Sequence, residues 1–275
     1  MYSFNLGVRA HDFHGETLDE LFSNISEKGI RTIQFAPRKS MPYLPWDMGI
    51  VTPELGSYIK SMLDKYGLRV SVLGCYINPS NPNEAARRRD IECFKESLML
   101  AKYIGAGMVA TETGAWKTPA LTNSEGAYQT LLATVRELLK TAEGLGVNIG
   151  IEPVTVYVIN SCAKMKRLLS DADSENLTIV FDPINAIGDD LDSQYKIIDD
   201  FFSTVNSKIS AIHLKDRLRD DQGRAVHCTA GKGLFDFRYF FDKARECKPF
   251  IDMLLEETAP DRFSAEKENL ISKGL

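Results

Sequence analysis

The sequence predicts an α/β fold of one closed (β/α)₈ barrel, a single TIM-barrel domain over residues 1–275. Short apolar runs alternate with longer amphipathic segments eight times, and no Gly/Ser-rich or Pro-rich linker separates them. Barrels of this class typically have about 250 residues, so the length fits. The expected strands are residues 4–9, 31–36, 69–76, 107–112, 147–152, 177–182, 209–214 and 250–256.

The segments between these strands have the periodicity of amphipathic helices. Thr122 with Glu125 matches the capping-box spacing of a helix start, and Thr52 before Pro53 matches an N-cap followed by proline. Gly146 stands where a helix must stop before the next strand. The expected helices are residues 17–28, 53–66, 86–104, 123–144, 160–170, 191–205, 235–247 and 261–272.

The end of the first strand argues against the main alternative, an open, doubly wound parallel sheet. Such a sheet places a Gly-rich phosphate-binding turn directly after its first strand. This chain continues instead with Arg-Ala-His-Asp-Phe-His-Gly at residues 9–15. Eight strand–helix units without that turn favour a barrel, in which the working residues lie at the carboxyl ends of the strands.

Four successive strands in the second half of the chain each end on a residue of metal-binding type. These residues are Glu152, Asp182, His213 and Glu256, separated by intervals of 30, 31 and 43 residues. Adjacent parallel strands would bring all four groups to the same end of the sheet. Three carboxylates directed at one point repel one another unless a cation lies between them. The pattern therefore predicts a metal site.

The alternation of side chains along a strand supports this arrangement. If Glu152 points into the barrel, so does Gly150, which leaves room at the barrel mouth. Glu112 ends the fourth strand in the same way. The eighth strand is ambiguous, because Glu256 and Glu257 point to opposite faces. We expect Glu256 to point inward, since it directly follows the apolar run.

Three carboxylates and one histidine form an oxygen-rich ligand set for one divalent metal ion. Such a set favours Mn²⁺ or Mg²⁺, while Co²⁺ and Zn²⁺ remain alternatives. Acidic residues at a barrel rim can instead pair only with Arg or Lys. That explanation is adequate for one strand end but poor for four in succession.

Short motifs recur along nearly the whole chain. They are Gly-Val-Arg-Ala-His-Asp at 7–12, Tyr-Ile-Asn-Pro at 76–79, Thr-Glu-Thr-Gly at 111–114, Ile-Glu-Pro at 151–153, Phe-Asp-Pro at 181–183, His-Leu-Lys-Asp at 213–216, Gly-Lys-Gly at 231–233 and Leu-Glu at 255–256. In this order they resemble the sugar phosphate isomerase/epimerase family of the xylose isomerase-like TIM barrels. Ketose 3-epimerases of this superfamily hold one divalent metal ion with Glu, Asp, His and Glu. The resemblance therefore implies the ligands Glu152, Asp182, His213 and Glu256.

The resemblance also implies a metal-dependent isomerase or epimerase of a small sugar, keto-polyol or sugar phosphate. The metal would polarise the ketone, and Glu152 would remove a proton from the carbon that bears the neighbouring hydroxyl. Glu256 would return a proton to the opposite face of the metal-stabilised enediolate. Inversion at the same carbon gives epimerisation, whereas return to the adjacent carbon gives aldose–ketose isomerisation, and the residues do not decide between these outcomes.

Five further residues are expected to contact the substrate: His11, Glu112, Asn185, Lys215 and His227. Many relatives carry Asp-x-x-His after the sixth strand, whereas this chain has Asp-Pro-Ile-Asn at 182–185. The Asn185 amide can bind a sugar hydroxyl but cannot act as a base near neutral pH. Lys215 points to the same side as His213 and can reach the substrate, unless it pairs with nearby acids instead.

Three other functions fit parts of the pattern. A keto-polyol dehydratase would use the same metal site and then expel a hydroxyl group. An endonuclease that resembles the apurinic-site enzymes of this superfamily would need several zinc ions and many histidines, whereas the chain has 4 histidines. A non-catalytic barrel that only binds a metabolite would not need the carboxylate pair Glu152 and Glu256.

The composition indicates a cytoplasmic protein without nucleic-acid or membrane partners. The net charge of −5 opposes non-specific binding to nucleic acid. No apolar stretch approaches the roughly 20 residues of a membrane span, and the first residues lack the pattern of a secretory signal. The 5 scattered cysteines are interpreted as small buried hydrophobic residues in a reducing compartment. Relatives form homodimers or homotetramers, and the sequence leaves either state open.

Overall fold

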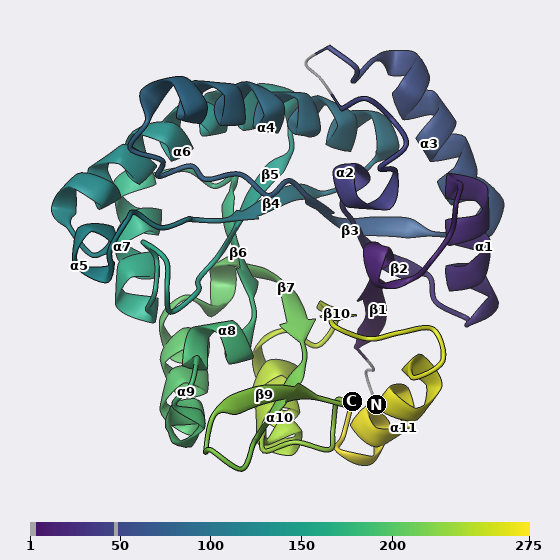
Figure 1. The fold of residues 1–275 in the computed structure, drawn as a ribbon, viewed down its shortest axis with the longest axis vertical. Coiled ribbons are helices and arrows are strands. Elements are labelled where there is room, and N and C mark those ends of the chain that lie inside the picture. Colours follow the sequence, from purple (N-terminus) through teal and green to yellow (C-terminus); the bar gives the residue numbers. More distant parts are fainter. Residues whose placement is uncertain (1–3, 47–48) are drawn as a thin grey trace.

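The computed structural model describes residues 4–46 and 49–275, in which eight parallel strands form a closed barrel surrounded by helices (Figure 1). The barrel strands are β1 (Asn5–Arg9), β2 (Thr32–Phe35), β3 (Arg69–Gly74), β4 (Met108–Glu112), β5 (Asn148–Glu152), β6 (Leu177–Phe181), β7 (Ile209–Leu214) and β10 (Asp252–Leu255). Their order around the barrel is β1-β10-β7-β6-β5-β4-β3-β2. The predicted fold class is confirmed.

The helices lie outside the barrel and follow the strands in alternation (Figure 1). The longer ones are α1 (Leu18–Glu27), α3 (Pro53–Tyr66), α4 (Glu84–Ile104), α6 (Glu125–Leu145), α7 (Cys162–Ala172), α9 (Gln194–Thr204), α10 (Phe237–Cys247) and α11 (Phe263–Ser272). Short helices are α2 (Pro37–Ser40), α5 (Pro119–Thr122) and α8 (Pro183–Ile187). Within the described part of the chain, no helix combines the length and the apolar character that a membrane crossing requires.

The structure contains an antiparallel hairpin that the sequence analysis did not predict. It consists of β8 (Asp216–Arg219) and β9 (Ala225–Cys228), directly after β7. The hairpin stands apart from the barrel, and only its first residue is fully buried. It therefore lacks the continuous apolar run by which buried strands are found in a sequence.

Two of the predicted helix starts had different outcomes. Thr52 caps α3 by accepting a hydrogen bond from the backbone N–H of Leu55, as predicted. The capping box of Thr122 with Glu125 was wrong, because Thr122 ends α5. The cap of α6 is Ser124, whose hydroxyl accepts from the backbone N–H of Ala127 at 3.2 Å. The expected helix 191–205 begins with a 3₁₀ turn, and α9 itself starts three residues later.

Two hydrophobic clusters form the core. The larger one joins strands and helices, whereas the smaller one comes only from barrel strands and contains Val72, Met108, Ala110, Val180, Ala211 and Leu254. A Cβ at Gly150 would lie 2.9 Å from Val180 and 3.1 Å from Ala110, so this glycine faces the same interior. Because side chains alternate along a strand, residues two positions beyond these inward-facing ones also face the barrel axis. Those residues include Glu152, Asp182, His213 and Glu256.

Candidate metal centre

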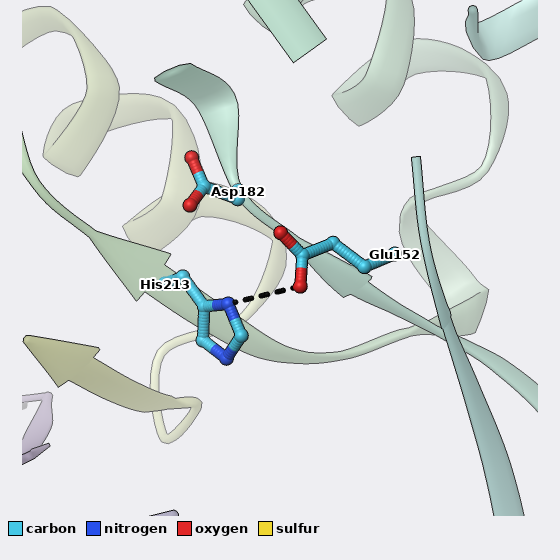
Figure 2. A group of neighbouring side chains, drawn as sticks. All are labelled: Glu152, Asp182 and His213. Carbon is cyan, nitrogen blue, oxygen red and sulfur yellow. Dashed lines mark ion pairs between the residues drawn. The ribbon is translucent and has the colours of Figure 1, made fainter. Parts of the chain in front are cut away.

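Three side chains from neighbouring strands meet at the carboxyl end of the barrel. Glu152 ends β5, Asp182 follows β6, and His213 lies near the end of β7. Figure 2 shows the Glu152 carboxylate facing the His213 imidazole, with the Asp182 carboxylate beside them. One ligand atom from each residue lies within 4.8 Å of the other two, and all three side chains are buried. The structure therefore brings together three of the four predicted ligands as a group that could hold a metal ion.

The fourth predicted ligand, Glu256, follows β10, which pairs with β7 on the side away from β6. The Nδ1 atom of His213 is 3.3 Å from Oε2 of Glu152 and 3.3 Å from Oε1 of Glu256. Glu256 is not part of the compact group of three. Its carboxylate also contacts two cations, with Oε2 at 3.2 Å from Nζ of Lys215 and Oε1 at 3.5 Å from Nη1 of Arg9.

Lys215 joins two of the predicted ligands. Its Nζ atom is 2.7 Å from Oδ2 of Asp182 and 3.2 Å from Oε2 of Glu256, and the side chain is buried. Burial alone would lower the pKa of Lys215, but the two carboxylates raise it above its ordinary value. The amine therefore stays protonated, and it neutralises part of the acidic cluster. A cation that binds between Asp182 and Glu256 has to displace this ammonium group or bind beside it.

The donor atoms fit a divalent cation. Both ring nitrogens of His213 are buried and form no hydrogen bond within the described residues. The Oδ2 atom of Asp182 is also buried. It forms an ion pair with the Lys215 ammonium, but the two groups are not oriented for a hydrogen bond. Buried polar atoms without partners often mark the position of an ion or a water molecule. Carboxylate oxygens with one imidazole nitrogen form a ligand set that suits Mn²⁺, Mg²⁺, Co²⁺ or Zn²⁺.

Burial and the neighbouring charges shift the pKa values of the cluster residues in different directions. Burial raises the pKa of Asp182. Burial also favours neutral Glu256, but the positive charges of His213, Lys215 and Arg9 prevail and lower its pKa to about 2. Burial favours neutral His213, yet the nearby glutamates raise its pKa to about 9. Asp182 is therefore the carboxylate that most needs additional positive charge, such as that of a metal ion.

Asn185 positions the carboxylates of the cluster. Its Nδ2 atom donates a hydrogen bond of 2.6 Å to Oε1 of Glu152, and its backbone N–H donates one of 2.9 Å to Oδ1 of Asp182. Glu112 lies next to Glu152 in the β4–β5 register. Burial and the charge of Glu152 raise the pKa of Glu112. Asn185 and Glu112 thus adjoin the cluster, as expected of residues at the barrel mouth.

A pocket of about 340 Å³ opens above the cluster. Its lining residues are Arg9, Lys39, Tyr76, Glu112, Glu152, Asn185, Lys215, Glu256 and Glu257. Most small-molecule pockets are mainly apolar, whereas charged and amide side chains predominate in this one. The pocket therefore suits a small ligand with many hydroxyl groups.

The two glutamates after β10 occupy different places. The backbone N–H of Glu256 donates to the carbonyl oxygen of Leu214 at 2.9 Å, which continues the pairing of β10 with β7. Glu257 has a left-handed backbone, with φ of +56°. Its carboxylate lies at the rim, where Arg217 donates hydrogen bonds of 2.7 and 2.9 Å to it. Of the two, Glu256 is the one whose carboxylate contacts His213.

His11 and His227 are not among the residues that line the pocket. The His11 ring packs edge-on against Tyr76 at a centroid distance of 6.3 Å, and burial together with the charge of Arg9 lowers its pKa to about 3. His227 lies on β9, with Nδ1 at 2.7 Å from Oε2 of Glu257. Substrate contacts by these two histidines remain predictions.

Sequence reasoning did not identify two cationic residues of the pocket, Arg9 and Lys39. Arg9 ends β1, so its place at the end of a strand predicts a position at the barrel mouth, but its guanidinium group does not belong to the metal-ligand pattern. Tyr76 and Lys39 come from different segments, and the Lys39 ammonium lies 4.0 Å from the centre of the Tyr76 ring. No local sequence pattern indicates that pair, because the contact depends on how the loops after β2 and β3 fold.

Comparisons with known proteins agree with the observed architecture. A family model for the xylose isomerase-like TIM barrel matches residues 22–274. An uncharacterized protein of Methanocaldococcus jannaschii is 23% identical in an alignment of 205 residues that covers 71% of this chain and 67% of that protein. A solved D-tagatose 3-epimerase-like protein superimposes with a TM-score of 0.79 and 19% identity, over 98% of this chain and 96% of that one.

A second solved structure, the 3-keto-D-glucoside 4-epimerase of E. coli, superimposes with a TM-score of 0.75 and 17% identity. That alignment covers 98% of this chain and 99% of the other. At such identities the two structures establish a shared fold. The family model, however, matches nearly the entire chain. The chain therefore belongs to the xylose isomerase-like TIM barrel family.

Proposed function

We propose that this protein is a metal-dependent isomerase or epimerase of a small sugar, keto-polyol or sugar phosphate. The observation that carries the proposal is a pair of buried carboxylates, Glu152 and Glu256, each 3.3 Å from Nδ1 of His213. They come from β5 and β10, which β6 and β7 separate in the barrel. Two carboxylates that approach one pocket from separate strands can remove a proton and return one to the same substrate.

The surrounding residues orient the carboxylate of Glu152 and keep that of Glu256 ionised. Asn185 holds Oε1 of Glu152, which leaves Oε2 as the oxygen that can take a proton from the substrate. The positive charges of His213, Lys215 and Arg9 keep Glu256 ionised, which is the form of a carboxyl group that can accept a proton. An epimerase works in both directions, so each carboxylate must be able to start as the base.

A divalent cation held by Glu152, Asp182, His213 and Glu256 would supply positive charge to polarise the substrate carbonyl and stabilise the enediolate oxygen. Mn²⁺ and Mg²⁺ are the preferred ions for this set, with Co²⁺ and Zn²⁺ as alternatives. The similarity to a 3-keto-D-glucoside 4-epimerase supports a carbohydrate as the substrate. The polar lining of the pocket supports the same choice.

Hydrogen exchange tests the proposal directly. The protein, loaded in turn with Mn²⁺, Mg²⁺, Co²⁺ and Zn²⁺, is incubated in deuterium oxide with a panel of ketoses, keto-glycosides and ketose phosphates. We expect NMR to show replacement of one C–H hydrogen by deuterium in at least one substrate, only with metal present. The position of the deuterium and the configuration of the product distinguish epimerisation from isomerisation.

Three outcomes would contradict the proposal. Metal-independent exchange would remove the cation from the chemistry, and a product lighter by one water molecule would identify a dehydratase. Bound metal, confirmed by calorimetry, without exchange across the whole panel would indicate a binding protein instead.

A further inference from the structure

Two of the five cysteines lie in contact with each other outside the candidate metal centre. Cys75 directly follows β3, Cys93 lies on α4, and their Sγ atoms are 3.9 Å apart. All five thiols are free, and within the described residues this is the only hydrogen bond between two cysteine sulfurs. The pair is therefore distinct from the other cysteines of the chain.

A cavity gives small molecules access to this pair. Both cysteines line a partly open cavity of about 150 Å³, together with Arg38, Trp46 and Tyr76. Cys75 is buried, whereas Cys93 is partly exposed. An engineered cavity of about this volume in another protein accommodates benzene, so a small hydroperoxide can enter. The geometry makes Cys93 the more accessible thiol and Cys75 the inner one.

The electrostatic environment assigns the same two roles. The hydrogen bond with the Cys75 thiol and the positive charge of Arg38 together lower the pKa of Cys93 to about 7, against the effect of burial. Glu96 acts in the opposite direction on Cys93. The same sulfur contact and complete burial raise the pKa of Cys75. At pH 7 about half of the Cys93 side chains are therefore thiolates, whereas Cys75 remains a thiol that can donate a hydrogen bond to the Cys93 sulfur.

We propose that Cys93 and Cys75 form a redox-active pair that hydroperoxides convert into a disulfide. In the first step the Cys93 thiolate attacks one peroxide oxygen, the O–O bond breaks, and an alkoxide or hydroxide leaves and takes a proton from water. Cys93 is then a sulfenic acid. In the second step the Cys75 sulfur attacks the Cys93 sulfur, the S–O bond breaks, and the hydroxide leaves as water with the Cys75 proton. The two thiols lose two electrons, and the peroxide gains them.

The position of the pair fits this chemistry. A disulfide needs the sulfurs to approach from 3.9 Å to about 2.05 Å, which requires movement of at least one of the two side chains. Tyr76 follows Cys75 directly, and it lines both this cavity and the pocket above the candidate metal centre. The modification site therefore lies one residue from the rim of that pocket. The proposal does not depend on the proposed catalytic function.

Peptide mapping of the full-length protein tests the proposal. The reduced protein is treated with hydrogen peroxide, digested without reductant and analysed by mass spectrometry. We expect a disulfide-linked peptide pair that contains Cys75 and Cys93, and its loss after Cys93→Ser. In Cys75→Ser the sulfenic acid has no partner thiol, so the reagent dimedone should label Cys93. Cys228→Ser is the matched control and should behave like the wild-type protein.

Two results would overturn the proposal. One is the absence of the linked peptide from peroxide-treated wild-type protein, which needs no variant. Another is a disulfide-linked peptide from the treated wild-type protein in which Cys93 is joined to Cys162, Cys228 or Cys247 instead of Cys75. Circular dichroism of each serine variant verifies that the labelled protein is folded.

Discussion

The two halves of the barrel place different chemistry at the same carboxyl end. The half from β5 to β10 supplies Glu152, Asp182, His213 and Glu256, all buried at the centre of the cluster. The half from β1 to β4 supplies Arg9, Tyr76 and Glu112, which line the pocket but stand outside the group of three potential ligands. Both halves have the same strand geometry. The fold therefore determines where the side chains meet, and the residue types at the strand ends determine the chemistry.

The two halves of the barrel therefore contribute different kinds of residue to the site. The β5–β10 half provides the group that could hold a cation and also the Lys215 ammonium, whereas the β1–β4 half provides pocket walls and a second countercharge. Arg9 illustrates the second role, because it contacts Glu256 across the β1–β10 pairing and also binds Asp12 through two hydrogen bonds from Nε and one from Nη2. Substitutions in the two halves should therefore have effects of very different size.

Replacing Glu152 should give the largest effect. We expect Glu152→Gln to fold normally and to lose turnover by about 10²–10⁴-fold, because a proton-transfer group contributes about this much to the rate. Glu112→Gln is the matched change on the neighbouring strand, and it should reduce turnover less than about tenfold, because Glu112 does not contact His213. Exchange rates in deuterium oxide measure both. Equal losses in the two variants would contradict the division between the halves.

Removing the buried ammonium group should give the next largest effect. Lys215→Met leaves Asp182 and Glu256 without their shared cation, so we expect the free energy of unfolding without metal to fall by about 3–5 kcal/mol. A divalent cation should recover much of this loss, because it binds the folded state and replaces the missing charge. Denaturant titrations with and without Mn²⁺ measure both quantities.

Lys39→Met is the control for that experiment. Lys39 is exposed and lines the same pocket from the other half, and we expect its removal to change stability by less than about 0.5 kcal/mol. A metal-induced gain that is no larger in Lys215→Met than in wild type would show that the cation does not bind beside Asp182.

The thiol pair gives a pH-dependent prediction for the β1–β4 half. The thiolate is the reactive form, so alkylation of Cys93 by iodoacetamide should accelerate as the pH rises through about 7 and then level off. Cys228, whose pKa burial raises to about 11, should react about a hundredfold more slowly at neutral pH. In Cys75→Ser the Cys93 profile should move to higher pH, because the contact that most lowers its pKa is gone. An unchanged profile would contradict the pairing.

Packing inside the barrel gives the smallest of these effects. In Gly150→Ala the new Cβ would lie 2.9 to 3.2 Å from Val180, Ala110 and Met108, so we expect a loss of about 1–3 kcal/mol in unfolding free energy. Gly144→Ala on α6 meets no atom within 4 Å, and this control should gain about 0.4–1 kcal/mol. Thermal denaturation compares the two. A neutral Gly150→Ala would mean that the interior has room to relax.

Most of the fold could be predicted from the sequence, because strand and helix periods are set by neighbouring residues. The eight barrel strands and the longer helices lie within a few residues of their expected positions. The hairpin of β8 and β9 could not be found in this way, since most of its residues are exposed and leave no apolar period. Ser124 replaced Thr122 as the α6 cap because the chain forms the extra turn α5 first.

The sequence alone also determined which residues meet at the centre, since parallel strands that end on Glu152, Asp182 and His213 must present them at one end of the barrel. Only the tertiary structure decided that Lys215 bridges Asp182 and Glu256, that Arg9 supports Glu256, and that the two thiols touch. Such contacts depend on rotamers and on the distance between chain segments. Neither property is encoded in the local order of residues, because packing of the whole barrel sets both.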